Sequence, residues 1–189
     1  PHYILPKEFP DVANRVLMCN SIGKSASATG WRLGWCLHPP ALTDTYRGIH
    51  DQMVVMSPHP MQVAALTYLQ LSSEYFQVEL RNRYKSRIDR LVDTLKRIGF
   101  EVAAPEGAYY VFAKYTPVPQ LRQVMDENEE RTTMDVAMYM LKEVGVACVP
   151  GDNFYGKDVE EGSHYLRFAA CRSDVEAACA KLDEKLLQT

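Results

Sequence analysis

The longest regular pattern in the chain lies in residues 74–98. Apolar side chains recur there every three or four positions, the spacing of one helix face. Gly99 comes directly after this segment. Helices commonly end at a glycine in left-handed backbone. The pattern predicts one long helix, with a boundary in the chain in or just after it. The residues of the apolar face are Phe76, Leu80, Tyr84, Ile88, Leu91, Leu95 and Ile98.

The segments on either side of this helix mix short apolar runs with helical spacing. Before it we expect strands at 16–19 and 31–37, the second stopped by Pro39-Pro40, and helices near 42–53 and 61–71. After it we expect strands, a polar loop and two helices, and the alternation indicates an α/β protein. The later elements are strands at 100–104, 108–114, 146–150 and 164–170, a loop at 115–132, a helix near 133–144, and a last helix opened by a capping box at Ser173 and Glu176.

Composition excludes several classes of protein. Of the 189 residues, 47% are apolar and 24% are charged, which is typical of a globular chain that can bury a core. The net charge of −3 gives no basic footprint for nucleic acid or an anionic membrane, and no apolar run reaches membrane-spanning length. The chain starts at Pro1, without an initiator methionine or the features of a signal peptide. We expect it to begin partway through a longer protein.

The five cysteines do not suggest a disulfide framework or a metal site. Their number is odd, no pair has C-x-x-C spacing, and the histidines form no ligand-spaced cluster. Cys19, Cys148 and Cys179 lie within apolar patterns. We therefore expect these three to be small buried hydrophobic residues in a reducing compartment, the cytoplasm.

The stretch "SIGKSASATGWRLGW" at residues 21–35 carries two cations among small residues and hydroxyls. A phosphate-binding P-loop would need a glycine five residues before Gly23, but Met18 occupies that position. A lysine that merely reaches solvent is a second interpretation. A third is a pyridoxal phosphate site, which needs an amine for a Schiff base and anion-binding groups for the phosphate. Lys24 offers the amine, and Ser21 and Arg32 offer the phosphate contacts.

This stretch resembles the lysine motif of fold-type I, class I/II aminotransferases, in the branch with kynurenine and prokaryotic-type aspartate aminotransferases. The match runs through Ser21, Lys24, Gly30, Arg32 and Gly34. Three later segments also resemble the family: "PEGAYYVF", "PGDNFYG" and "HYLRFAA". The resemblance implies a pyridoxal 5'-phosphate enzyme that exchanges an amino group between an L-amino acid and a 2-oxo acid. It implies that Lys24 carries the cofactor as a Schiff base, with Ser21 and Arg32 at its phosphate.

Arg167 is the candidate for binding the substrate α-carboxylate. It alternates with Leu166 and Phe168 in an apolar strand, where a guanidinium needs a partner. From the pattern alone, an internal salt bridge and a substrate carboxylate are equally good partners. The resemblance favours the substrate.

The resemblance also divides the chain. It implies that residues 1–73 are the C-terminal part of the large cofactor domain, 74–98 the long interdomain helix and 99–189 the small α/β domain. The family's aspartate at the pyridine nitrogen precedes the lysine by more residues than this chain holds, and Asp11 is too close to Lys24 to take that role. We therefore expect the C-terminal part of an enzyme that is a homodimer when complete, and weak cofactor binding and activity for these residues alone.

Two other functions share these residues. A pyridoxal phosphate-dependent lyase or synthase on the same fold would use the same lysine, serine and arginines. A non-catalytic regulatory or assembly domain could also have kept the fold. The intact set of Ser21, Lys24, Arg32 and Arg167 argues against the second.

Overall fold

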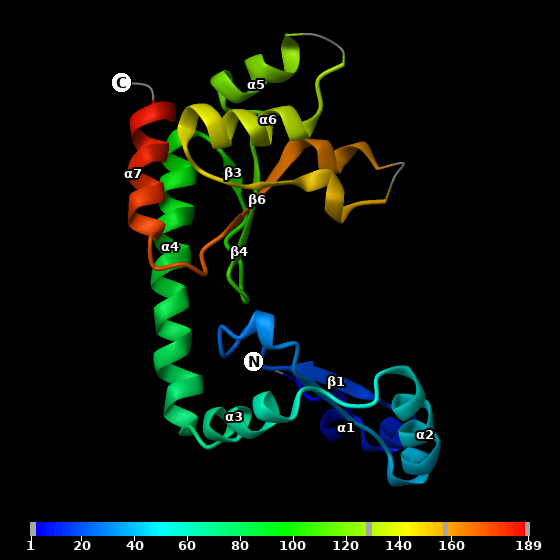
Figure 1. The fold of residues 1–189 in the computed structure, drawn as a ribbon. Coiled ribbons are helices and arrows are strands. Elements are labelled where there is room, and N and C mark those ends of the chain that lie inside the picture. Colours follow the sequence, from blue (N-terminus) through cyan, green and yellow to red (C-terminus); the bar gives the residue numbers. More distant parts are fainter. Residues whose placement is uncertain (1–2, 128–129, 157–158, 188–189) are drawn as a thin grey trace. The chain divides into compact units, whose positions relative to one another are not determined.

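The computed structural model describes residues 3–127, 130–156 and 159–187. The chain divides into two compact units, Pro1–Ser73 and Glu74–Thr189, here called the N-terminal and C-terminal units and described separately. Figure 1 shows the fold coloured along the sequence. Within the described part of the chain, no helix combines the length and the apolar character needed to span a membrane.

The N-terminal unit is built on a two-stranded antiparallel ribbon, β1 paired with β2. Helices and 3-10 turns precede and follow the ribbon along the chain, and Ile22, Ala28 and Ala65 form a small core among the described residues. The elements in chain order are α1 (Leu5–Glu8), a turn at Pro10–Arg15, β1 (Met18–Ser21), a turn at Thr29–Trp31, β2 (Gly34–Leu37), a turn at Pro40–Leu42, α2 (Thr43–Met53) and α3 (His59–Leu69).

Both predicted strands of this unit exist, but each begins later than predicted. The N–H of Val16 bonds the carbonyl of Ala13 and closes a 3-10 turn, so β1 starts only at Met18. Arg32 adopts left-handed backbone, which a strand cannot include, so β2 starts at Gly34. The strand ends before Pro39, as predicted.

The C-terminal unit contains a four-stranded antiparallel sheet in the order β3-β4-β6-β5. In the described part of this unit, four helices accompany the sheet, and one continuous core joins sheet and helices. The elements are a π-helical turn at Tyr75–Glu79, α4 (Leu80–Ile98), β3 (Glu101–Val102), β4 (Tyr110–Lys114), α5 (Pro119–Asp126), α6 (Thr133–Tyr139) with a π-helical turn at Met140–Val144, β5 (Val149–Pro150), 3-10 turns at Gly151–Phe154 and Glu160–His164, β6 (Tyr165–Ala169) and α7 (Val175–Leu186).

The predicted long helix corresponds to the turn at Tyr75–Glu79 followed by α4. Gly99 ends it in left-handed backbone (φ 112°), and its N–H bonds the carbonyls of Leu95 and Lys96. In Figure 1, α7 runs beside α4. Arg97 reinforces this contact with an ion pair of 2.6 Å to Asp183.

The two faces of the sheet differ in burial. Val111 and Ala113 of β4 and Leu166 and Phe168 of β6 are buried in the core. Alternation along a strand turns the intervening residues to the other face, which is only half-buried. Arg167 lies on this second face, opposite Phe112 in the register.

Three predictions for this unit were wrong. The predicted loop at 115–132 contains α5, which has proline at its first position and buries Leu121 and Val124. Of the predicted strand at 146–150, only Val149 and Pro150 pair with β6. The last helix begins after Asp174 without a side-chain cap, so the predicted box at Ser173 and Glu176 does not form. Asn128 and Glu129 of the predicted loop lie outside the described residues.

Candidate functional site

The lysine-bearing loop connects β1 to β2 and is closed by backbone hydrogen bonds. The N–H of Ile22 bonds the carbonyl of Leu33 at 3.4 Å, which continues the register of the ribbon. Inside the loop, the N–H of Ala26 bonds Ile22, and the hydroxyl of Thr29 donates to the carbonyl of Gly23 at 2.9 Å. Ile22 is fully buried, so the loop is fixed at its base while Lys24 is exposed above it.

Gly34 is required where the loop enters β2. A Cβ at this position would come within 2.7 Å of the carbonyl oxygen of Asn20 and 3.3 Å of the Ser21 Cβ. Only glycine allows β2 to approach β1 this closely. The Ser21 hydroxyl oxygen also lies near the following backbone, 3.6 Å from the Cβ position of Gly23. Ser21 is the last residue of β1, directly before the loop that carries the lysine.

Arg32 closes the other end of the same loop in a strained conformation. Its backbone is left-handed (φ 53°, ψ 40°), which costs a non-glycine residue about 1–2 kcal/mol. Its Nη1 donates a hydrogen bond of 3.1 Å to the carbonyl of Thr29, so the guanidinium is turned back toward the loop. Such strain often marks a functional position. The connection from β1 to β2 thus carries Lys24 and Arg32, with Ser21 at the end of β1, and all three residues are exposed.

These residues fit the requirements of pyridoxal phosphate. An exposed primary amine can form an imine with its aldehyde, and a hydroxyl and a guanidinium are suitable donors for its phosphate. Each of the three is set by the backbone of a single connection rather than by distant elements. This fit concerns the lysine and the phosphate contacts only.

Arg167 belongs to the C-terminal unit, where its guanidinium is enclosed by aromatic rings. Its Cζ lies 4.3 Å from the ring centre of Tyr110 and 4.4 Å from that of Phe154. The Nε atom is buried and has no hydrogen-bond partner among the described residues. The ion pairs found between described residues do not include Arg167, so the alternative of an internal salt bridge receives no support there.

The aromatic partners of Arg167 were not predicted. Tyr110 lies in "PEGAYYVF" and Phe154 in "PGDNFYG", two segments that sequence comparison singled out only as family motifs. Phe112, which pairs with Arg167 across the strands, stacks on Tyr165 with ring centres 5.0 Å apart. Tyr110 and Phe112 stand on either side of Val111 in the sequence. Because alternate residues of a strand share one face, this pattern could have predicted an aromatic face of the sheet.

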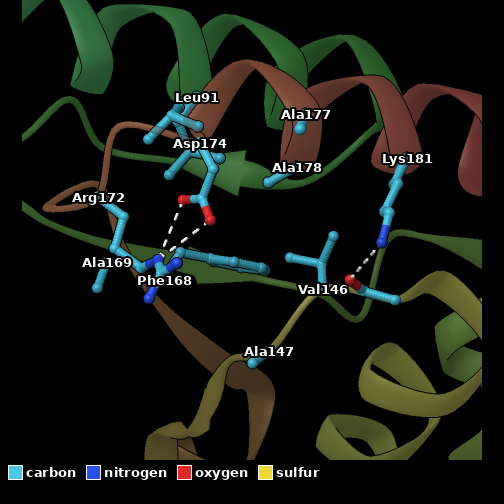
Figure 2. Close-up of a pocket in the computed structure, with 12 residues that line it drawn as sticks. Leu91, Val146, Ala147, Phe168, Ala169, Arg172, Asp174, Ala177, Ala178 and Lys181 are labelled. Atoms are coloured by element: carbon cyan, nitrogen blue, oxygen red, sulfur yellow. Dashed lines mark hydrogen bonds and ion pairs between the residues drawn. The ribbon is translucent and has the colours of Figure 1, made fainter.

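A separate pocket of about 390 Å³ lies between α4, α7 and the end of β6, and Figure 2 shows its lining. Leu91, Val146 and Phe168 form apolar walls. Its charged groups already have partners: Arg172 Nε lies 3.1 Å from the Asp174 carboxylate, and Lys181 contacts the carbonyl of Gly145. The pocket includes none of the four predicted site residues. It is therefore distinct from the candidate site.

Comparison with known proteins agrees with the motif. Residues 6–182 match the family model described as aminotransferase class I and II. Kynurenine–oxoglutarate transaminase 1 of Homo sapiens is 30% identical over 190 residues, a match that covers 94% of this chain and 43% of the human protein. The chain thus spans less than half the length of this relative.

Two solved structures show the same fold. The crystal structure of Bna3p from Saccharomyces cerevisiae gives a TM-score of 0.80 at 25% identity, covering 96% of this chain and 45% of that protein. N-succinyldiaminopimelate aminotransferase from Mycobacterium tuberculosis gives 0.74 at 26% identity, covering 91% and 42%. The family prediction and the α/β fold class are confirmed. The chain belongs to the class I and II aminotransferase family, whose members use pyridoxal phosphate.

Proposed function

We propose that this chain is the C-terminal part of a transaminase, in which Lys24 holds pyridoxal 5'-phosphate as a Schiff base. In this proposal Ser21 and Arg32 bind the cofactor phosphate, and Arg167 binds the α-carboxylate of an L-amino acid or a 2-oxo acid. Residues 1–73 complete the large cofactor domain, 74–98 are the interdomain helix and 99–189 are the small domain. The observation that carries the proposal is the single loop that presents amine, hydroxyl and guanidinium together.

The cofactor, when bound, supplies the electron sink that makes the substrate α-proton acidic. The contribution of this chain is to hold and to move the proton. Lys24 Nζ would be the general base that accepts the α-proton. Ser21 and Arg32 fix the phosphate end, so that the reacting end is oriented by a two-point attachment.

The environment of Arg167 supports its role at the carboxylate. Aromatic ring faces attract the cation without accepting strong hydrogen bonds from its N–H groups. Tyr110 and Phe154 therefore stabilise the charge and leave its fork of donors for a planar acceptor. A carboxylate satisfies the buried Nε that has no partner among the described residues.

The relatives named above act on kynurenine and on N-succinyldiaminopimelate, so family membership leaves the amino-acid side chain open. For this chain we propose an L-amino acid donor and a 2-oxo acid acceptor. We also propose a homodimeric, cytoplasmic complete enzyme. Release of a 2-oxo acid with the pyridoxamine form of the cofactor would distinguish a transaminase from a lyase or synthase, which gives elimination or cyclised products.

Borohydride trapping tests the proposed attachment. The chain is incubated with one equivalent of pyridoxal phosphate and reduced, and the modified lysines are mapped by mass spectrometry of tryptic peptides. We expect the label to concentrate on Lys24, although binding by these residues alone is weak. Lys7, an exposed lysine of the same unit, is the internal control.

Matched variants give the experiment its specificity. Arg32→Ala should reduce labelling of Lys24 without changing Lys7, because it removes a phosphate contact and not the amine. Arg15→Ala, which removes another exposed arginine of the unit, should change neither. The proposal would be contradicted if all lysines were labelled equally, or if Lys24 were labelled as strongly in Arg32→Ala as in the unmodified chain.

A further inference from the structure

Two of the five cysteines face each other across the ribbon of the N-terminal unit. In the register of β1 and β2, Cys19 is the direct partner of Cys36. No sequence pattern predicted this pair, since the two residues are 17 positions apart and neither belongs to a C-x-x-C motif. The prediction that Cys19 is buried was wrong: Cys19 is exposed and Cys36 half-buried.

The hydrogen-bond pattern sets the distance between the two backbones. The bond from the N–H of Ile22 to the carbonyl of Leu33 marks those residues as a hydrogen-bonded pair. Such pairs alternate along an antiparallel ribbon, so the pairs Ser21–Gly34 and Cys19–Cys36 are both of the non-hydrogen-bonded type. Cα atoms of that type lie about 4.5 Å apart, with side chains close together on one face. This falls within the range of about 4.4–6.8 Å found in disulfides.

The two thiols also interact in the structure. Hydrogen bonding with the Cys36 thiol and repulsion from its thiolate raise the pKa of Cys19. Interaction with the Cys36 thiol also raises the pKa of Tyr46 of α2. The Cys36 Sγ also donates a hydrogen bond of 3.8 Å to the carbonyl of Leu37.

We propose that Cys19 and Cys36 form a reversible disulfide when the chain meets a small-molecule disulfide. One protein thiolate attacks a sulfur of the reagent, breaking its S–S bond and releasing one small thiol. The second protein thiolate then attacks the mixed disulfide, forming the Cys19–Cys36 bond and releasing the second small thiol. Two protein thiols are oxidised and one reagent disulfide is reduced, and the two protein protons end on the released thiols.

The cross-link would enclose the whole lysine-bearing loop. Ser21, Lys24 and Arg32 all lie between the two cysteines, so the disulfide ties together both ends of the segment that presents them. If proximity along the chain decided the pairing, Cys171 would pair with Cys179, because these two are only 8 residues apart. The folded ribbon favours the Cys19–Cys36 pair. The inference is independent of the proposed cofactor chemistry.

Tryptic mapping after equilibration with oxidised and reduced glutathione tests the proposal. Free thiols are trapped by alkylation in acid-quenched samples before digestion. Cleavage after Arg15, Lys24, Arg32 and Arg47 places the two cysteines on separate peptides, residues 16–24 and 33–47. We expect these peptides joined by a disulfide, in excess over their glutathione adducts by at least about tenfold, because the second thiol is already in place.

Controls separate the ribbon geometry from general thiol reactivity. Cys36→Ser should leave Cys19 as a glutathione adduct, whereas Cys171→Ser, at another exposed cysteine, should leave the cross-link unchanged. In denaturant the preference for the 16–24 and 33–47 pair should disappear. Separate glutathione adducts on Cys19 and Cys36 in the folded chain, thiols that stay reduced, or a preference that persists in denaturant would each overturn the proposal.

Discussion

The two units of this chain bury their apolar side chains very differently. The C-terminal unit has one continuous core that extends from α4 through the sheet to α7. Among its described residues, the N-terminal unit buries the apolar side chains of Ile22, Ala28 and Ala65 only, while Leu37, Met53 and Leu66 are 54%, 77% and 57% exposed. The lysine-bearing loop thus lies on a unit held mainly by backbone hydrogen bonds and turns, and Arg167 on a unit with its own core.

The difference has a cause in the helices. α4 has a single apolar face, which is buried against the core from Ile88 to Ile98. In α3, apolar residues point in all directions, so Ala65 is buried while Val63, Leu66 and Leu69 are exposed. Burial of apolar area is the main stabilising contribution to folding. We therefore expect the two units to differ in stability, and the predictions below test this comparison from the largest effect to the smallest.

The largest effect is expected at Cys148. Burial raises the pKa of this thiol to about 12, compared with an ordinary value of 9.0. At about pH 8 the reactive thiolate should therefore be about a thousandfold rarer than for an ordinary thiol. Alkylation by iodoacetamide, followed by mass spectrometry, should show Cys148 reacting correspondingly slowly and accelerating as the pH rises. Fast reaction that denaturant does not accelerate further would show that the C-terminal core is open.

A core truncation should separate the two units. Leu95 is fully buried, so Leu95→Ala should destabilise the C-terminal unit by about 3 kcal/mol. Both tryptophans, Trp31 and Trp35, lie in the N-terminal unit, and their fluorescence reports on it alone. In urea unfolding, the circular dichroism transition should move to lower urea while the fluorescence transition stays in place. Leu66→Ala makes the same change at an exposed site and should shift neither the circular dichroism transition nor the fluorescence transition by much. Equal shifts of both signals after Leu95→Ala would show one cooperative unit.

Much of the C-terminal unit was predictable because its elements have strong periodic patterns. α4 and its cap at Gly99 followed from spacing and one glycine. α5 was missed because its prolines and charges resembled a loop, although Pro119 starts the helix. Short elements depend on tertiary packing, which a local pattern does not contain.

The sequence was sufficient to name candidate site residues, but not the contacts that support them. The spacing of Ser21, Lys24 and Arg32 was sufficient to name the loop. The left-handed backbone of Arg32 and the rings around Arg167 could not be predicted, because they depend on the closure of the loop and on contacts with residue 154. The Cys19–Cys36 pair depends on strand register, which separation in sequence does not reveal.

A glycine pair tests the ribbon itself. Gly34→Ala would place a methyl group 2.7 Å from the carbonyl oxygen of Asn20, so β1 and β2 would have to separate. We expect a loss of about 1–3 kcal/mol from the N-terminal unit, measured by urea unfolding with tryptophan fluorescence. Gly30→Ala in the same loop meets no atom within 4 Å and is the matched control. Equal effects from the two variants would mean that ribbon packing does not limit the stability of this unit.

The smallest effect concerns the cap of one helix in the C-terminal unit. The helices α2, α3, α4, α5 and α7 begin without side-chain caps, whereas Thr132 and Asp135 form a capping box at the start of α6. Hydrogen bonds from the backbone N–H and the hydroxyl of Thr132 lower the pKa of Asp135, with a smaller contribution from Arg131. A lowered pKa in the folded state stabilises the fold fully above the ordinary value of 3.8, and this contribution is lost as the pH falls through the folded-state pKa.

Asp135→Asn should therefore lower the urea midpoint of the circular dichroism transition near neutral pH. The difference in urea midpoint between this variant and the unmodified chain should become smaller once the pH falls below 3.8. Asp126→Asn, at an exposed carboxylate 3.5 Å from Arg122, controls for the general loss of a charge and should show a smaller gap, because surface ion pairs are screened. The urea transition followed by tryptophan fluorescence should be the same in both variants as in the unmodified chain, since neither site lies in the N-terminal unit. If the difference in urea midpoint did not depend on pH, the effect of Asp135 would come from packing rather than from its charge.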